Sequence, residues 1–387
     1  MYNFQFFMPT KVLFGAGQLQ NLHKEVLPGK KALVVTSGGT SAKRYGYLAA
    51  LEKELDLAGV EHVLFDEIRP NPTAQSVMDG AARAKDAGCD FVVALGGGSV
   101  MDSSKMIAMM MTNPGTLWDY SGSKAGGKKP FEHDAAPLVC VTTSAGTASE
   151  VDFGGVISND EAGEKSALFH PSMFPVLSVV DSDLTLNIPP HLTAYQGMDA
   201  FFHAAETVIN RNVHPMAEMF ALKTIELVAK YLPKACIDGS DREARAAMHL
   251  ANSLAGFYML CTSQHTMEHV MGSNHPKLEH GAGLIMISHA YFDFFAERRA
   301  AESQMAKMAQ AMGVMSPTSG KAFIRALDNL IMSVGCSGLK MSNYGITEEE
   351  VLTWPQRVHE VIGGDLTADP LPLSDDDYLT IYQQSYK

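Results

Sequence analysis

The chain has 387 residues, of which 46% are hydrophobic and 19% are charged, a balance typical of compact globular proteins and not of disordered chains. This length exceeds what one ordinary hydrophobic core supports, so two domains are expected. The formal net charge of -13 argues against DNA, RNA or an anionic membrane surface as a partner.

Short apolar runs alternate with helical patterns in the first half of the chain. The apolar runs predict buried strands at residues 31–36, 61–65, 91–95, 137–142 and 176–181. The stretches between them predict helices at residues 47–57, 73–87 and 100–111. Strands that alternate with helices indicate a parallel sheet covered on both faces, so this half is predicted to be an α/β domain.

A glycine-rich segment follows the third predicted strand. The strand leads into Gly96, Gly97, Gly98, Ser99 and, less than one turn later, Asp102. Glycines at a strand-to-helix junction let the backbone approach a pyrophosphate, whose oxygens accept the free N–H groups of the helix. The segment matches neither the G-x-G-x-x-G fingerprint nor the P-loop. A nucleotide site is one interpretation, and a tight turn without a ligand is the other.

The fourth predicted strand leads into a run of small hydroxyl residues from Thr142 to Glu150, which includes Thr143, Thr147 and Ser149. Such hydroxyl groups suit contacts to phosphate or ribose. The alternative is a polar loop that caps the next helix through Thr147 or Ser149.

Strand signals stop after about residue 183, and the pattern is helical from residue 190 onward. Helices are predicted at residues 216–231, 241–261, 296–312 and 321–334. The stretch 184–190 is therefore the natural boundary between an α/β domain, residues 1–184, and an all-helical domain, residues 185–387.

Two pairs of potential metal ligands fall in the helical half. Asp199 and His203 are four residues apart, as are His265 and His269, and His280 follows eleven residues later. Residues at this spacing lie on one helix face about 5–6 Å apart at Cβ. One carboxylate and several imidazoles form a ligand set that divalent transition metals prefer. The pairs predict a metal-dependent enzyme, although fourteen histidines will form some such pairs by chance.

Four motifs occur in a fixed order: Gly96-Gly-Gly-Ser99-x-x-Asp102-x-x-Lys105, Thr143-x-x-Gly146-Thr147-x-Ser149-Glu150, Gly197-x-Asp199-x-x-x-His203 and His265-x-x-x-His269-x10-His280-Gly281. Together they resemble the iron-dependent (group III) alcohol dehydrogenases, relatives of glycerol dehydrogenase and dehydroquinate synthase. The resemblance covers nearly the whole chain. It implies a dinucleotide-binding α/β domain, an all-helical metal-binding and substrate domain, and an active site in the cleft between them.

The resemblance also implies roles for individual residues. The implied metal ligands are Asp199, His203, His265 and His280. His269 would lie beside the substrate and relay a proton, as an imidazole does in either direction near neutral pH. The implied cofactor contacts come from Gly96, Gly97, Gly98, Ser99, Asp102, Thr142, Thr143, Thr147 and Lys165. The N-terminal segment, residues 3–14, resembles the one that pairs across the family's dimers, so a homodimer or higher homo-oligomer is expected.

The interval before His280 departs from the family pattern. Many members have the last histidine at the tenth position after the middle one, whereas this chain has it at the eleventh. Members with a Pro-x-Leu-x-His-Gly segment, as at residues 276–281 here, share the longer form. His280 is therefore kept as the ligand, with His275 as the reserve candidate.

A second departure concerns the cofactor. NAD-using members often have an aspartate directly after the strand equivalent to residues 31–36, where it bonds the ribose and repels a 2′-phosphate. This chain has Ser37, Gly38 and Gly39 there, followed by Lys43 and Arg44. Hydroxyl groups, glycine amides and two basic side chains can receive the phosphate, so the sequence favours NADP(H) over NAD(H).

We therefore predict a reversible NAD(P)-dependent alcohol dehydrogenase or aldehyde reductase with one Fe²⁺ per chain, or Zn²⁺ as the alternative, acting on a small primary alcohol or diol. The alternatives are a glycerol-dehydrogenase-like polyol dehydrogenase, a dehydroquinate-synthase-like lyase or cyclase, and a non-catalytic binding module. The cytoplasm is the expected compartment, because the five cysteines are scattered without a C-x-x-C pair and no signal peptide or membrane span is predicted.

Overall fold

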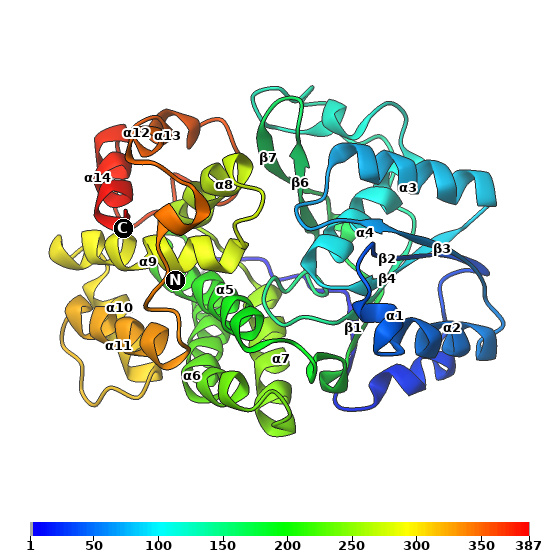
Figure 1. Ribbon diagram of the computed structural model, residues 1–387, viewed down its shortest axis with the longest axis horizontal. Helices are drawn as coiled ribbons and strands as arrows, with labels where there is room; N and C mark the ends of the chain where they lie inside the picture. The colour runs from blue at the N-terminus through cyan, green and yellow to red at the C-terminus, as the bar shows by residue number, and fades with distance from the viewer. Residues whose placement is uncertain (1–2, 387) are drawn as a thin grey trace. The chain divides into compact units, whose positions relative to one another are not determined.

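The computed structural model describes residues 3–386, which form two compact units (Figure 1). One unit is Phe7–Leu186, and the other comprises residues 187–386 together with residues 3–6. The predicted boundary lies two residues earlier than the observed one. The prediction was wrong for residues 3–6, which it assigned to the α/β domain. They contact the helical unit because Phe4 stacks on His214, with ring centroids 4.0 Å apart, and Phe6 stacks on Tyr258 at 6.2 Å.

The unit Phe7–Leu186 contains a six-stranded sheet in the order β1-β8-β5-β4-β2-β3, with every neighbouring pair parallel. Its strands are β1 (Lys11–Phe14), β2 (Lys31–Ser37), β3 (Glu61–Ile68), β4 (Phe91–Gly96), β5 (Leu138–Thr142) and β8 (Leu177–Val180). An antiparallel hairpin of β6 (Gly154–Asn159) and β7 (Glu164–Phe169) forms a separate two-stranded sheet. The predicted fold class, a parallel α/β domain followed by helices, is confirmed.

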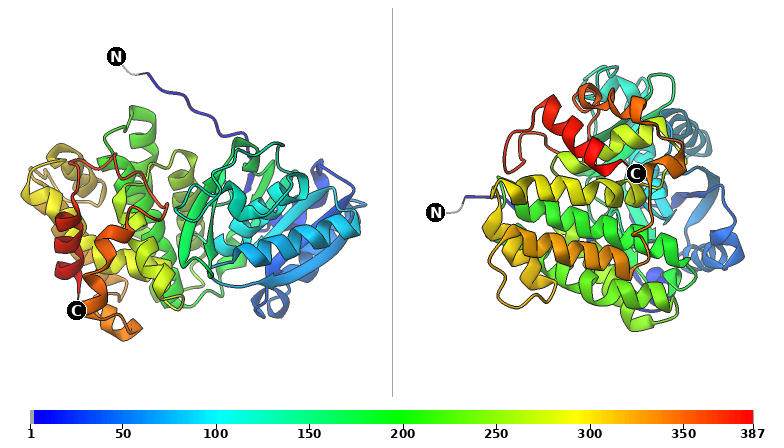
Figure 2. Two further views of the ribbon diagram at one scale, coloured as in Figure 1. Left: turned by 90° about the horizontal axis from the view of Figure 1, so that it is seen from above. Right: turned by 60° about the vertical axis from the view of Figure 1, so that its left-hand side comes forward.

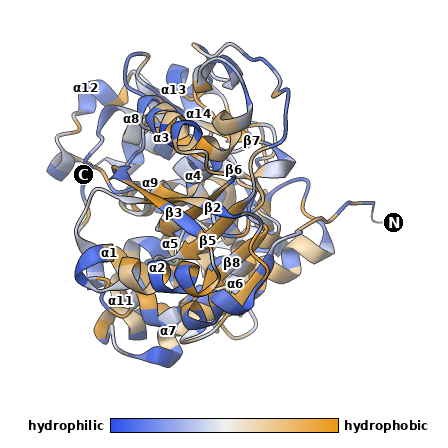
Figure 3. Ribbon diagram, turned by 90° about the vertical axis from the view of Figure 1, so that its right-hand side faces the viewer, coloured by the Kyte–Doolittle hydropathy of each residue, from blue (hydrophilic) through white to orange (hydrophobic). Residues whose placement is uncertain are grey.

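Alternate side chains of the sheet enter two separate hydrophobic cores. Leu33 and Val35 pack in a core that includes residues of α3 and α4, while Val34 and Val93 pack with residues of α1 and α2. Successive strand residues point to opposite faces, so a strand buried on both faces requires a continuous apolar run. Figure 3 shows these apolar strands between the two helical layers. The helices are α1 (Ser41–Arg44), α2 (Tyr47–Leu57), α3 (Ala74–Ala87) and α4 (Gly98–Thr112), with 3-10 turns η1 (Gln18–Lys24), η2 (Leu117–Tyr120), η3 (Pro171–Met173) and η4 (Ser182–Thr185).

The described part of the second unit is built from helices, several of which lie side by side in Figures 1 and 2. They are α5 (Pro190–Ile209), α6 (Pro215–Ile237), α7 (Arg242–Phe257), α8 (Ser263–Asn274), α9 (His280–Glu297), α10 (Glu302–Ala311), α11 (Gly320–Ser333), η5 (Met341–Tyr344), α12 (Glu348–Val351), α13 (Trp354–Arg357) and α14 (Asp375–Ser385). Helix α5 packs against α6, α7 and α9, and each of its residues from 197 to 209 is buried. A helix buried on all sides belongs at the centre of a bundle.

Three predicted helices end differently in the structure. The predicted helix 216–231 continues through Pro233 to Ile237. The predicted helix 296–312 is interrupted, because α9 ends at Glu297 and α10 begins at Glu302, with Arg299 in a left-handed conformation (φ 51°) at the break. The predicted helix 241–261 ends at Phe257. Residues 3–10 form an extended segment without regular secondary structure, visible beside the N label in Figure 2. Within residues 3–386, the helices are too short or too polar to cross a lipid bilayer.

Candidate active site

Three imidazoles converge on one carboxylate oxygen in the helical unit. Nε2 of His203 and Nε2 of His265 each lie 3.6 Å from Oδ1 of Asp199. Nε2 of His280 lies 3.5 Å from the same oxygen. Four donors placed tetrahedrally about 2.1 Å from an ion are about 3.4 Å apart, so the observed spacing is that of ligands around a cation. The structure thus brings together all the residues predicted to bind a metal.

Three helices supply these four side chains. Helix α5 presents Asp199 and His203 one turn apart, and α8 presents His265 in its first turn. Helix α8 continues to Asn274, and a short turn then returns the chain so that His280 is the first residue of α9. The eleven-residue interval therefore directs His280 to the cluster. His275, the reserve candidate, instead contacts Glu350, with Nε2 and Oε1 2.8 Å apart.

Asp199, His203 and His265 are buried, while the His280 side chain is 25% exposed. Among the described residues, Oδ1 of Asp199 and Nε2 of His265 have no hydrogen-bond partner. Burial alone would raise the pKa of Asp199, but His203, His280 and His265 together hold that pKa well below its usual range. Buried polar atoms without partners cost free energy unless a ligand satisfies them. These donors therefore fit a divalent cation.

Two buried glutamates that the sequence did not single out lie behind the imidazoles. Nδ1 of His265 contacts Oε1 of Glu206, and Nδ1 of His280 contacts Oε2 of Glu268. Both glutamates are fully buried. Each contact joins two different helices, α5 with α8 for Glu206 and α8 with α9 for Glu268, so helix spacing in the sequence did not reveal it.

A thiol also lies close to this cluster. The Cys261 sulfur and a ring nitrogen each of His203 and His265 all lie within 4.8 Å of one another. Burial raises the pKa of the Cys261 thiol, which favours the neutral form. Because the thiolate is the form that binds metals, Cys261 is a weaker donor here than the imidazoles.

His269 lies beside the cluster but outside the set of four. Its ring centroid is 5.7 Å from that of His280, and its Nδ1 is 2.9 Å from the carbonyl oxygen of Ile362. A carbonyl only accepts hydrogen bonds, so this Nδ1 carries a proton and Nε2 faces away from the carbonyl. The Ile362 segment packs closely on α8, because a Cβ atom on Gly363 would lie 2.8 Å from the Cα of Thr266.

The predicted cofactor residues of the α/β unit gather at one edge of its sheet. They lie at or directly after the carboxyl ends of β2, β4 and β5, which are neighbouring strands. The N–H of Thr143 donates to the carbonyl of Gly96 at 2.9 Å, and a Cβ atom on Gly98 would lie 2.4 Å from Cγ2 of Thr147. The residues at this edge are Ser37, Gly38, Gly39, Gly96, Gly97, Gly98, Ser99, Thr142, Thr143 and Thr147. Open α/β sheets bind ligands outside this edge.

Asp102 lies on α4 beside the loop after β5, and Lys165 lies on β7 of the hairpin. Oδ1 of Asp102 accepts a hydrogen bond from the Ser149 hydroxyl at 2.6 Å, and Oδ2 accepts one from the N–H of Val156 at 2.9 Å. Burial raises the pKa of Asp102 to about 6. Lys165 is buried and pairs with Ser158 across the hairpin. Ser149 does not cap a helix, since the element that follows is β6.

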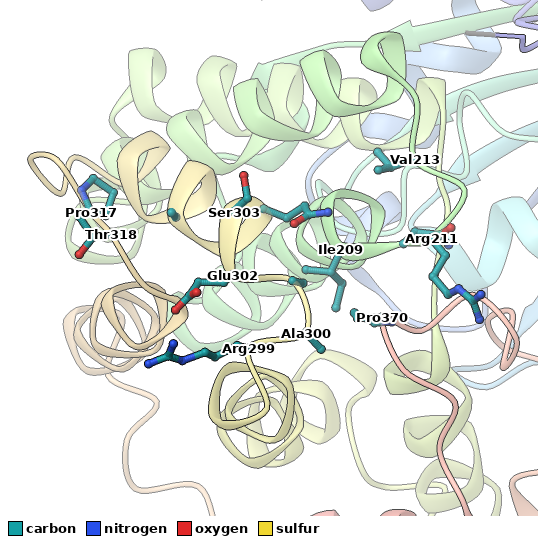
Figure 4. Close-up of a pocket in the computed structure, with 14 residues that line it drawn as sticks. Ile209, Arg211, Val213, Arg299, Ala300, Glu302, Ser303, Pro317, Thr318 and Pro370 are labelled. Carbon is teal, nitrogen blue, oxygen red and sulfur yellow. The ribbon is translucent and has the colours of Figure 1, made fainter. Parts of the chain in front are cut away.

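A cavity of about 970 Å³ elsewhere in the helical unit contains none of the predicted ligands (Figure 4). It is lined by residues from the end of α5, the α9–α10 and α10–α11 connections and Pro370. Arg211 and Arg299 come from different segments of its wall, as the close-up shows. This cavity is distinct from the Asp199 cluster.

Comparisons with known proteins give matches in both halves of the chain. The sequence profile "Iron-containing alcohol dehydrogenase" matches residues 9–182, and "Fe-containing alcohol dehydrogenase family, C-terminal" matches residues 193–386. The chain is 38% identical over 253 residues to a choline dehydrogenase of Bacillus subtilis, which is 65% of this chain and 62% of that enzyme. It is 30% identical to an NADPH-dependent butanol dehydrogenase of Clostridium saccharobutylicum, over 99% of this chain and 98% of that enzyme.

A solved structure is also similar along its whole length. The archaeal halo-thermophilic alcohol dehydrogenase of a Red Sea brine pool superimposes with a TM-score of 0.94 at 32% identity, covering 100% of this chain and 99% of the other. The two profiles together span most of the chain, and their order follows the two structural units. The chain therefore belongs to the iron-containing alcohol dehydrogenase family and is an oxidoreductase of the iron-type alcohol dehydrogenase class.

Proposed function

We propose that this enzyme interconverts small primary alcohols or diols with their aldehydes, using one Fe²⁺ held by Asp199, His203, His265 and His280. One observation carries the proposal: three Nε2 atoms lie at nearly equal distances around a buried, unpartnered carboxylate oxygen. Zn²⁺ remains the alternative ion, since the same donor types bind it.

The chemistry divides between the bound groups and the protein. A divalent cation supplies Lewis acidity toward a substrate oxygen, and the nicotinamide supplies hydride chemistry. The chain's own part is to hold the four donors on α5, α8 and α9 and to move a proton. His269 suits the proton transfer, because its Nδ1 is fixed on Ile362 while Nε2 is directed away from that carbonyl.

Metal content and activity of two variants test this assignment. His203→Ala removes one donor, so we expect loss of the iron and of alcohol oxidation together. His269→Asn should keep one iron per chain but slow turnover. His289→Ala is a matched control, because His289 is exposed and pairs with Asp328. Anaerobically purified His203→Ala enzyme that still holds one iron per chain would contradict the proposed ligand set.

The small-alcohol substrate is supported by the names of two relatives, which refer to choline and butanol. A polyol dehydrogenase and a dehydroquinate-synthase-like lyase remain the alternatives. Net accumulation of NAD(P)H with simple alcohols supports the dehydrogenase, because a lyase that uses NAD transiently accumulates none. A panel of short alcohols, diols and glycerol then separates the two kinds of dehydrogenase.

We further propose that NADP(H) is preferred, although the structure changes the basis of this idea. Lys43 contacts Asp66, a carboxylate that β3 brings beside the segment after β2. The Lys43 hydrogen bond lowers the pKa of Asp66. Lys43 is thus already paired, and Ser37 with Arg44 becomes the principal candidate for contact with a 2′-phosphate. Dissociation constants for both cofactors test the preference, and a clear preference for NAD(H) contradicts it. Asp66→Asn frees Lys43 and should shift the ratio toward NADP(H).

We also propose a homodimer formed through β1 and a cytoplasmic location. Strand β1 is an edge of the sheet, and exposed apolar side chains lie near it: Phe7 is 61% exposed, Phe14 40% and Val176 46%. Edge strands with such side chains readily pair with another chain. Light scattering of the parent and of Phe7→Asp tests the dimer. The five free cysteines accord with a reducing compartment.

A further inference from the structure

Two of the three ligand histidines of the Asp199 cluster, His265 and His280, differ from His269 in what lies behind them. In His265 and His280 the nitrogen remote from Asp199 contacts a glutamate, Glu206 or Glu268. In His269 the corresponding Nδ1 meets a neutral backbone carbonyl. A carboxylate accepts a stronger hydrogen bond than a carbonyl does and makes the imidazole more basic.

Glu206 is held rigidly in its position on α5. Its Oε2 accepts hydrogen bonds from the N–H of Thr262 at 2.7 Å and from the Thr262 hydroxyl at 3.0 Å. That hydroxyl lies 2.7 Å from the hydroxyl of Tyr291, which in turn contacts Asp369. One oxygen of Glu206 is therefore fixed by Thr262, which directly precedes α8, and the other is directed at His265.

Glu268 occupies space that a glycine leaves open. A Cβ atom on Gly283 would lie 2.8 Å from Cγ of Glu268 and 3.1 Å from its Oε1. Gly283 lies in the first turn of α9, three residues after His280. Because Gly283 has no side chain, the fully buried carboxylate of Glu268 can reach His280, the first residue of α9. Glu268 lies on the Nδ1 side of His280, whereas Asp199 faces Nε2.

A carboxylate behind an imidazole has a defined chemical consequence. Because an ionised carboxylate only accepts hydrogen bonds, Nδ1 of the histidine must carry a proton, and the lone pair of the neutral ring then lies on Nε2. Both Nε2 atoms point at Oδ1 of Asp199, as a metal ligand requires. The two glutamates therefore select the tautomer that binds a cation and stop the rings from rotating.

We infer that Glu206 and Glu268 are positioning residues that set the tautomer and orientation of His265 and His280 and thereby the affinity of this enzyme for its metal ion. The inference rests on the proposed ligand set. His269, which has a carbonyl partner, is left as the histidine that exchanges a proton. The charge of the group behind the ring thereby distinguishes His265 and His280 from the proton-handling His269.

Metal affinity of Glu268 variants tests the inference. Zn²⁺ is titrated into metal-free enzyme against a chromophoric chelator, and Co²⁺ absorbance reports the coordination geometry. Glu268→Gln keeps an acceptor but loses the charge, so we expect Zn²⁺ affinity to fall about 10-fold, and about 100-fold in Glu268→Ala. Glu279→Gln is the matched control, because Glu279 immediately precedes His280 and its carboxylate contacts Tyr344. That variant should bind Zn²⁺ like the parent.

Gly283→Ala provides an independent test that keeps the charge. Its added methyl group displaces the Glu268 carboxylate from His280, so Zn²⁺ affinity should again fall and the Co²⁺ spectrum should change. The melting temperature of each metal-free variant separates this effect from misfolding. If Glu268→Gln does not fold, Gly283→Ala decides the question.

The two possible failures are distinguishable. If the parent takes up no metal, or His203→Ala keeps it, the ligand set is refuted. If the parent binds one Zn²⁺ and folded Glu268→Gln or Gly283→Ala binds it within threefold of the parent, the positioning role is refuted.

Discussion

A buried lysine in the α/β unit tests how the loops at the carboxyl ends of β2, β4 and β5 are held together. We call these loops, which carry the predicted cofactor residues, the cofactor edge. Lys105, on α4, is fully buried, and its ammonium group contacts three acceptors: the Ser149 hydroxyl at 2.8 Å, the Gly154 carbonyl at 2.7 Å and Oδ1 of Asp152. All three N–H donors of the ammonium are thus used. Ser149 in turn donates to Asp102. Lys105 therefore joins α4, the loop after β5 and the hairpin.

Lys105→Met keeps the length of the side chain but leaves the Asp152 carboxylate without its cation. Removing one member of a buried ion pair costs about 3–5 kcal/mol. The Asp152 side chain is 22% exposed, so water partly compensates and the lower end, about 3 kcal/mol, is expected. The free energy of unfolding decreases by about 2 kcal/mol per molar urea, so the urea concentration at the unfolding midpoint should fall by about 1.5 M.

Tryptophan fluorescence can follow this unit separately. The chain has two tryptophans, Trp118 in the α/β unit and Trp354 in the helical unit. In a Trp354→Phe background, fluorescence therefore reports the unfolding of the α/β unit. Lys85→Met is the control, because Lys85 is an exposed lysine of α3, and surface changes cost within about 0.5 kcal/mol.

A double variant examines the cause of the Lys105 effect. Asp152→Asn removes the orphaned charge, so the cost of Lys105→Met should be smaller in the Asp152→Asn background than in the parent. Strictly additive costs, or a Lys105→Met cost below about 1 kcal/mol, would refute the view that this ion pair holds the cofactor edge together.

Three further predictions concern packing, pH and the metal. Gly98→Ala places a methyl group against Thr147, so we expect a loss of about 1–3 kcal/mol in stability and weaker NAD(P)H binding in a fluorescence titration. Burial raises the pKa of Asp369 to about 7. The protonated side chain therefore stabilises the folded protein fully below about pH 4, and up to about 4 kcal/mol of this stability is lost as the pH rises through 7. Asp369→Asn should remove that part of the pH dependence in urea unfolding at pH 4.5 and 8. Removing the metal should lower the melting temperature, since an ion at 100 times its dissociation constant adds about 2.7 kcal/mol.

The alternation of apolar runs with helical patterns was enough to predict the parallel sheet. All five predicted strands are present within a few residues, because strands buried on both faces must be continuously apolar. The hairpin of β6 and β7 was not predicted. Its strands contain Gly154, Gly155 and Lys165 and follow neither an apolar run nor strict alternation, since the hairpin packs against α4 instead of joining the main sheet.

Local spacing could indicate the ligands but not the groups behind them. The pair Asp199 and His203 is visible in the sequence because one helix holds both residues. Contact of Glu206 with His265 depends instead on how α5 packs beside the first turn of α8, 59 residues later. Likewise, Asp66 reaches Lys43 only because β3 lies beside β2 in the sheet. Such pairings are set by tertiary structure, and a single sequence does not display them.

The buried carboxylates also explain why metal binding and folding should be coupled in the helical unit. Asp199, Glu206 and Glu268 lie around the same imidazoles and are almost or fully buried. Without a cation, three like charges repel one another in a medium that screens them poorly. Burial alone would lower the pKa of His265, but Cys261, Glu206 and Asp199 raise it well above its usual value, so a metal ion competes with protons for this ring. A divalent ion supplies the positive charge that these carboxylates lack. Metal uptake should therefore release protons and become weaker as pH falls, which calorimetry in buffers of different ionisation enthalpy can measure.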